Sequence, residues 1–116
     1  MYLDVVLSKM DLTEQELSFL LEERKWGNIN FTLIDCREPF YNELSEIAGT
    51  DENIPGTEVD KILENHGKED MIILYSNDPN SLKYVSIHIV HAGIQNTFFL
   101  NEDYEKLTYN LEKEYK

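Results

Sequence analysis

The sequence predicts an α/β fold in which a mostly parallel sheet is covered by helices on both faces. Two short apolar runs, Phe31–Asp35 and Met71–Tyr75, carry this prediction. Continuous rather than alternating apolar residues are typical of strands that are buried on both sides. Helical patterns fill the segments between such runs, and an alternation of strands and helices favours a parallel sheet.

The N-terminal part of the chain contains one edge strand and one helix in this interpretation. Leu3–Leu7 is the candidate strand. Thr13–Glu16 (TEQE) has the form of a capping box, in which the first and fourth side chains bond each other's backbone N–H groups. We therefore expect a helix from there to about Arg24. Its inward-facing residues are expected to be Leu17, Leu20 and Leu21.

Further elements follow in order. Pro39–Ile47 and Val59–Asn65 are predicted helices, the second ending near His66 with Gly67 as the stop signal. A longer helix, Leu82–Ala92, follows the Met71–Tyr75 strand. Its apolar stripe consists of Leu82, Val85, Ile89 and Val90.

The last elements are predicted to be a third central strand, Asn96–Leu100, and a closing helix, Glu102–Tyr115. Three tyrosines of this closing helix, at positions 104, 109 and 115, are spaced so that they spread around its surface. Packing and surface anchoring explain Tyr104, Tyr109 and Tyr115 as well as a binding role does.

Length and composition limit the class of protein. A chain of 116 residues allows one domain, residues 1–116, with a single core. No apolar run reaches the roughly 20 residues that span a bilayer, and the first residues lack a signal-peptide pattern. We therefore expect a cytoplasmic protein with no membrane contact. The single cysteine, Cys36, excludes an internal disulfide and a four-cysteine zinc site.

The net charge of the chain is strongly negative. Ten Lys and Arg residues against 23 Asp and Glu residues give a formal net charge of −13. A field of this sign repels phosphate backbones, so we expect no nucleic-acid partner. The main effect of the excess of acidic residues is expected to be solubility.

Two polar segments follow the predicted central strands. In Leu33–Pro39 (LIDCREP), Asp35 and Arg37 come at the carboxyl end of a strand, where open α/β sheets place their sites. We expect a structural pair, with Asp35 bonding loop amides and Arg37 bridging to a neighbouring carboxylate. Cys36 between them is expected to be a small buried residue, with a pKa raised by Asp35 and Glu38 unless Arg37 offsets them.

The second segment, Ser76–Ser81 (SNDPNS), joins a strand to a helix and has the outline of an anion site over a helix N-terminus. It contains no cysteine, no basic residue and no glycine. Asp78 is predicted to be the N-cap and Pro79 the first helical residue. The Asp78 carboxylate would then occupy the N–H groups that an anionic substrate needs.

Taken in order, these motifs resemble those of the rhodanese-like family. Leu33–Pro39 matches the family's LIDxREP strand end, Ile54–Gly56 its IPGA turn, and Tyr75–Leu82 its YCRxGxRS loop. Gly93–Tyr104 echoes the family's later GF…VYxLxGGY segment. The resemblance runs from about Leu12 to Leu107, and it implies a three-layer α/β/α sandwich.

The resemblance also implies a chemistry, in which a loop cysteine takes a sulfur atom from thiosulfate or a related donor as a persulfide. A low-pKa thiolate is required. Ser76 stands at the position of that cysteine, and a hydroxyl cannot carry a persulfide. Pro79 replaces the family's glycine, while Asn77 and Ser81 replace its arginines. With Asp78 and Asn80, these residues form a loop that we interpret as a vestigial active site.

The preferred hypothesis is therefore a rhodanese-like domain that lacks sulfurtransferase activity and acts as a binding or regulatory module, with another protein as its partner. The alternative is an enzyme that uses Ser76 as nucleophile or Cys36 as sulfur acceptor. His88 and His91 lie three residues apart on one predicted helix, but no third ligand accompanies them, so neither a metal nor another cofactor is expected. The oligomeric state stays open.

Overall fold

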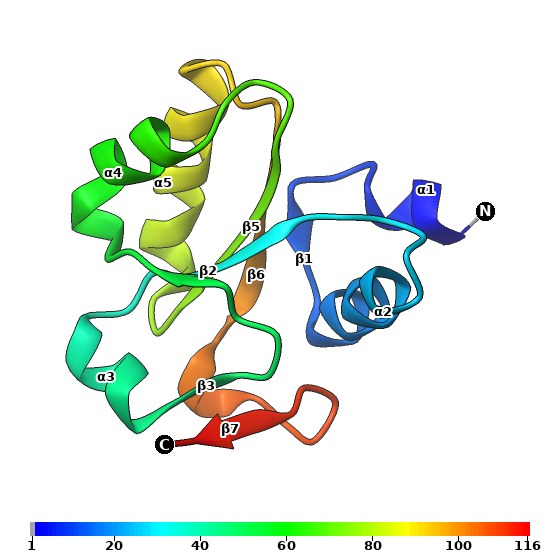
Figure 1. Cartoon of the computed structure of the whole chain (residues 1–116), viewed down its shortest axis with the longest axis vertical. Helices are drawn as coiled ribbons and strands as arrows, with labels where there is room; N and C mark the ends of the chain where they lie inside the picture. Colours follow the sequence, from blue (N-terminus) through cyan, green and yellow to red (C-terminus); the bar gives the residue numbers. More distant parts are fainter. Residues whose placement is uncertain (1) are drawn as a thin grey trace.

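The central element is a five-stranded parallel sheet, described by a computed structural model that covers residues 2–116 (Figure 1). The strand order is β1-β6-β5-β2-β4, and every neighbouring pair is parallel. A small antiparallel pair, β3 with β7, lies apart from it. The strands are β1 (Asp11–Leu12), β2 (Thr32–Asp35), β3 (Ser45–Ile47), β4 (Glu52–Asn53), β5 (Met71–Ser76), β6 (Asn96–Asp103) and β7 (Lys113–Tyr115).

Helices cover both faces of this sheet, which confirms the predicted three-layer arrangement. Helices α1 and α2 lie on one face and α4 and α5 on the other (Figure 1). The helices are α1 (Tyr2–Val6), α2 (Glu14–Lys25), α3 (Pro39–Leu44), α4 (Val59–Asn65) and α5 (Pro79–His91), with 3₁₀ turns at Gly56–Glu58 and Tyr104–Lys106. Within residues 2–116, no helix is both long and apolar enough to cross a membrane.

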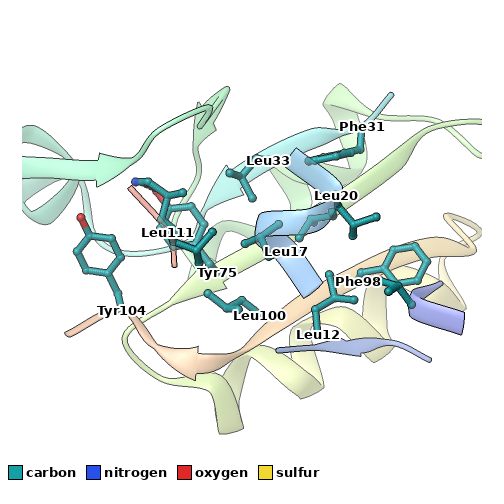
Figure 2. Packing of buried hydrophobic residues seen from close by; sticks show 13 residues of the cluster. Leu12, Leu17, Leu20, Phe31, Leu33, Tyr75, Phe98, Leu100, Tyr104 and Leu111 are labelled. Carbon is teal, nitrogen blue, oxygen red and sulfur yellow. Dashed lines mark hydrogen bonds between the residues drawn. The ribbon is translucent and has the colours of Figure 1, made fainter. Parts of the chain in front are cut away.

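Strand β5 shows why the central strands read as continuous apolar runs. Ile73 and Tyr75 point into the core beneath α2, where Figure 2 shows Tyr75 beside Leu17 and Leu100. Ile72 and Leu74 point into a second core beneath α4 and α5. Because side chains alternate along a strand, two apolar layers require apolar residues at successive positions.

Helix α2 begins as its sequence predicts. The Thr13 hydroxyl accepts from the Glu16 N–H, and the Glu16 carboxylate accepts from the Thr13 N–H at 2.9 Å. Leu17 and Leu20 are fully buried against the sheet, and Leu21 is half-buried. Two donors at the helix start are thus satisfied by local side chains.

Two predicted elements near the N-terminal half differ in the structure. Leu3–Leu7 is not a strand, because α1 occupies it and packs the Tyr2 ring edge-on against Phe19, with centroids 4.7 Å apart. Asp11–Leu12 takes the edge position beside β6 instead. The predicted helix Pro39–Ile47 ends at Leu44, and its last three residues pair with β7.

The closing helix predicted for Glu102–Tyr115 is wrong. Strand β6 continues to Asp103, a single 3₁₀ turn follows, and the chain returns as β7. Tyr104 and Leu111 are buried in the same core cluster as Leu17 and Leu20 of α2 (Figure 2), which they reach from a 3₁₀ turn and from the loop before β7. Tertiary packing therefore overrides the local helix propensity of this polar segment.

This correction yields a prediction about the C-terminal segment. Leu111→Ala removes a side chain that is 3% exposed, whereas Tyr109→Ala removes one that is 94% exposed. We expect the first change to lower the free energy of unfolding by about 2–4 kcal/mol and the second by no more than about 0.5 kcal/mol. Urea denaturation of both variants measures this, and equal effects would contradict the observed path of the chain.

Candidate functional site

The carboxyl end of β2 carries a buried ion pair. Asp35 is 0% and Arg37 4% exposed. The Arg37 Nε donates to both carboxylate oxygens of Asp35, at 3.0 and 3.1 Å, and its Nη2 donates to Oδ2 at 2.8 Å. The Arg37 backbone N–H also donates to Asp35, at 2.9 Å. The carboxylate that Arg37 meets is therefore its own neighbour, and Asp35 accepts from a loop amide as predicted.

Arg37 also joins parts of the chain that are distant in sequence. Its Nη2 donates to the Ser45 carbonyl oxygen at the start of β3. Its guanidinium carbon lies 3.7 Å from the centroid of the Tyr104 ring, which stacks on Tyr75. Burial alone lowers the pKa of Arg37, but the hydrogen bonds and charge of Asp35 outweigh it and raise that pKa. The guanidinium stays charged, and its Nε and Nη2 donors are bonded to Asp35 and Ser45.

Two asparagines hold the surrounding loops. Asn42 of α3 donates to the Asp35 carboxylate at 3.1 Å. Asn53 donates to the carbonyl oxygens of Asp35 and Arg37, both at 2.9 Å. The Gly56 N–H donates to the Cys36 carbonyl oxygen. The two segments that resemble family motifs are therefore bonded to each other through their backbones.

The Ser76–Ser81 loop is closed by its own side chains. The Asp78 carboxylate accepts from the Ser81 N–H at 3.2 Å and from the Ser81 hydroxyl at 2.7 Å. The Ser76 hydroxyl accepts from the Asp78 N–H at 3.0 Å, and Pro79 has no N–H. Hydrogen bonds from the Ser81 side chain and backbone lower the pKa of Asp78. Asp78 caps α5 as predicted and stays ionised.

The segment after β2 and the Ser76–Ser81 loop both line a pocket of about 410 Å³. The residues that line it come from the β2–α3 connection, the turn at Gly56, the end of β5 and the start of α5. The lining residues are Cys36, Arg37, Glu38, Tyr41, Gly56, Thr57, Ser76, Asn77, Asp78, Ser81, Leu82 and Val85. The structure thus brings Ser76, Asp78 and Arg37 to one wall, as their positions at adjacent strand ends imply.

Cys36 lines this pocket but is buried, with 7% of its surface exposed. Burial, and secondarily the charge of Asp35, raise the pKa of its thiol far above the ordinary value. The thiol is therefore protonated near neutral pH, and a protonated thiol is a poor nucleophile. The paired Arg37 does not offset this effect.

The histidines lie away from the pocket. His88 and His91 are exposed on α5, and within residues 2–116 no cluster of three or more His, Cys, Asp or Glu side chains is arranged to hold a metal ion. The third histidine, His66, ends α4 with its Nε2 2.8 Å from Glu52 and its Nδ1 3.3 Å from Asp70.

Sequence reasoning did not identify four residues that shape the site. Tyr75 and Tyr104 flank Arg37, and Glu38 and Tyr41 line the pocket. The predicted closing helix spreads Tyr104, Tyr109 and Tyr115 around its surface, which leaves open whether Tyr104 packs in the core. Glu38 and Tyr41 follow Arg37 at the start of a short helix, which was the one available signal that they face the same space.

The five-stranded parallel sheet with helices on both faces is an α/β fold that matches the fold of a rhodanese-like domain. Two solved structures carry this comparison. The crystal structure of the Alr3790 protein from Anabaena sp. matches with a TM-score of 0.65 and 21% identity, covering 75% of this chain and 79% of that one. The rhodanese-like domain of the same protein matches with a TM-score of 0.56 and 23% identity, covering 74% and 82%.

At these identities the similarity concerns the fold, and the chain is similar to Alr3790 in architecture. No family model and no curated protein matches the sequence. The expected rhodanese-like sandwich is confirmed by this comparison. The roles of individual residues depend on the geometry described above.

The buried ion pair yields a stability prediction. Asp35→Asn leaves the Arg37 guanidinium buried without its counter-charge, so we expect the free energy of unfolding to fall by about 3 kcal/mol. Glu38→Gln changes an exposed carboxylate nearby and is the matched control, with an expected change within about 0.5 kcal/mol. Urea denaturation at pH 7 compares them. An Asp35→Asn effect no larger than the control would contradict the assigned role of the pair.

The cap of α5 yields a pH prediction. The pKa of Asp78 is lowered in the folded state from an ordinary value of 3.8. Its ionised form therefore stabilises the fold fully above that value, and this contribution is lost as the pH falls through the lower, folded value. Wild type should have a higher thermal midpoint than Asp78→Ala at pH 7, and the difference should shrink below pH 3.8. Glu69→Ala, at an exposed turn position, is the control and should show no such trend.

Proposed function

We propose that this chain is a rhodanese-like domain without sulfurtransferase activity that acts as a binding or regulatory module. One observation carries the proposal. The Asp78 carboxylate occupies the N–H and hydroxyl donors of Ser81 at the start of α5, where an anionic sulfur donor would have to bind. Ser76, at the position of the family's cysteine, has no thiol.

The remaining chemistry of the loop supports the same proposal. The Ser76 hydroxyl accepts from the Asp78 N–H, and no histidine lines the pocket to act as its base. The one nearby cation, Arg37, has its guanidinium bonded to Asp35 and Ser45. A persulfide would need both a thiolate and a positive environment, and neither is available on this wall.

The enzymatic alternative has one observation in its favour. Ser76 and Cys36 both line a pocket large enough for a small substrate. Cys36 would need to lose its proton in a buried site next to Asp35, which burial and charge both oppose. We therefore keep this alternative as the outcome that the following experiment is designed to detect.

A thiosulfate:cyanide assay with the purified protein tests the proposal, together with mass spectrometry for a persulfide on Cys36. We expect background turnover and no persulfide. Ser76→Cys should also remain at background, because Asp78 and Pro79 still deny an anion its donors. Ser76→Cys combined with Asn77→Arg, Asp78→Gly and Pro79→Gly restores a thiol, a positive charge and N–H groups, and turnover is expected only there.

A variant pair distinguishes the alternatives further. Turnover by wild type comparable to that of an active family member would overturn the proposal. Loss of that turnover in Cys36→Ala or Ser76→Ala would then assign the nucleophile. Turnover by Ser76→Cys alone would contradict the view that the loop donors are already occupied.

A further inference from the structure

We propose that the pocket beside Ser76 binds a basic side chain, arginine or lysine, presented on an apolar segment of a partner protein. This inference rests on the proposed binding function and specifies the chemistry of the partner. It reverses the charge of the ligand that the loop position would otherwise suggest. The walls, the rim and the flanking surface of the pocket each support it.

The walls are suited to a side chain with an apolar stem. Tyr41 from α3 lies on one side, and Leu82 and Val85 from α5 lie on the other. A long basic side chain covers apolar surface with its methylene groups while its charged end stays near polar groups. The Tyr41 ring, which is 40% exposed, additionally offers a face for a cation.

The charges at the pocket favour a cation. Glu38 and Asp78 both line it and both are exposed. The Glu38 side chain does not cap α3, and among residues 2–116 it takes part in no salt bridge. Arg37 is the one cation in the lining, and Asp35 already neutralises it at 2.8 Å. The wall therefore presents uncompensated negative charge to the pocket.

An unsatisfied acceptor lies in the same wall. The buried Asn77 Oδ1 has no hydrogen-bond partner among the described residues, and Asn77 lines the pocket. A buried carbonyl oxygen without a donor costs about 1–3 kcal/mol. This oxygen is buried, so a ligand in the pocket meets it only after the Asn77 side chain rotates, and a guanidinium or ammonium group then supplies the missing donor.

Exposed apolar side chains on α3 and α5, the two helices that contribute to the pocket lining, favour a protein over a free small molecule. Phe40 and Leu44 on α3 are 64% and 55% exposed, and Tyr84 on α5 is 71% exposed. These apolar side chains belong to the two helices that form the pocket walls, where they can cover residues that flank the inserted side chain. The net charge of −13 attracts a basic partner and opposes a second copy of this chain.

Nuclear magnetic resonance titration of the ¹⁵N-labelled full chain tests the inference. The probes are three peptides, acetyl-Gly-Leu-X-Leu-Gly-amide, in which X is arginine, its neutral isostere citrulline, or glutamate. We expect the arginine peptide to shift the backbone amides of residues 37–41 and 76–85. Citrulline should bind about three- to fivefold more weakly, as expected for the loss of one exposed ion pair, and glutamate more weakly still.

Two matched variants test whether the Glu38 carboxylate contributes to binding of the basic side chain. Glu38→Gln should weaken the arginine peptide by the same three- to fivefold factor and leave the citrulline peptide unchanged. Glu43→Gln removes an exposed carboxylate from the same helix that does not line the pocket, and should leave both peptides unchanged. Circular dichroism verifies that both variants remain folded.

Several results would overturn the inference. They are equal binding of the three peptides, equal effects of Glu38→Gln and Glu43→Gln, or shifts outside the pocket. Concentration-dependent shifts of the same amides without peptide would assign the pocket to a second copy instead. Any of these results combined with background thiosulfate turnover refutes only the basic ligand, whereas sulfurtransferase turnover refutes the proposed function itself.

Discussion

The rest of the site depends on the buried pair between Asp35 and Arg37. Removing two charges from water is costly, and such a pair persists only if its remaining donors and acceptors are satisfied. Here Asn42, the Ser45 carbonyl oxygen and the Tyr104 ring complete that requirement. Segments that are far apart in sequence are thereby fixed around one cation. We infer that the pair contributes position rather than net stability, since its hydrogen bonds tie the end of β2 to α3 and to the start of β3.

The same pair determines what the neighbouring pocket can bind. An arginine at a strand end would attract an anion if its charge and donors were free. Asp35 neutralises the charge and accepts from the Nε and Nη2 donors, and Asp78 accepts from the Ser81 N–H and hydroxyl at the start of α5. At Arg37 and at the start of α5, a carboxylate of the chain itself therefore opposes the binding of an anion. The shape of the pocket depends on the packed elements, whereas its electrostatic preference depends on a few side chains.

The sequence predicted elements with strong local signals and failed where distant contacts decide. The capping box at Thr13 and the Asp78–Pro79 start of α5 are local, and both were located correctly. Strand β7 forms because Leu111 and Tyr104 reach the core and because β3 is available to pair, which no local pattern reveals. The pocket was predictable only in part for the same reason. The sequence identified the Ser76–Ser81 loop. Glu38, Tyr41 and Asn77 line one pocket only because the fold brings the β2–α3 connection, the turn at Gly56 and this loop together.

The geometry of the loop links the proposed absence of sulfurtransferase activity to the stability of α5. An anion site over a helix N-terminus keeps several N–H groups without partners until the substrate arrives, which is a standing cost to the free protein. A capping aspartate supplies the missing acceptor permanently, and proline at the first helical position removes one donor that would need a partner. Each change that stabilises α5 therefore also excludes the anion. A loop released from catalysis is expected to move in this direction, since most routes to stability at an active site reduce its activity. The capping Asp78 carboxylate also adds negative charge to the lining of the pocket, which favours a basic ligand there.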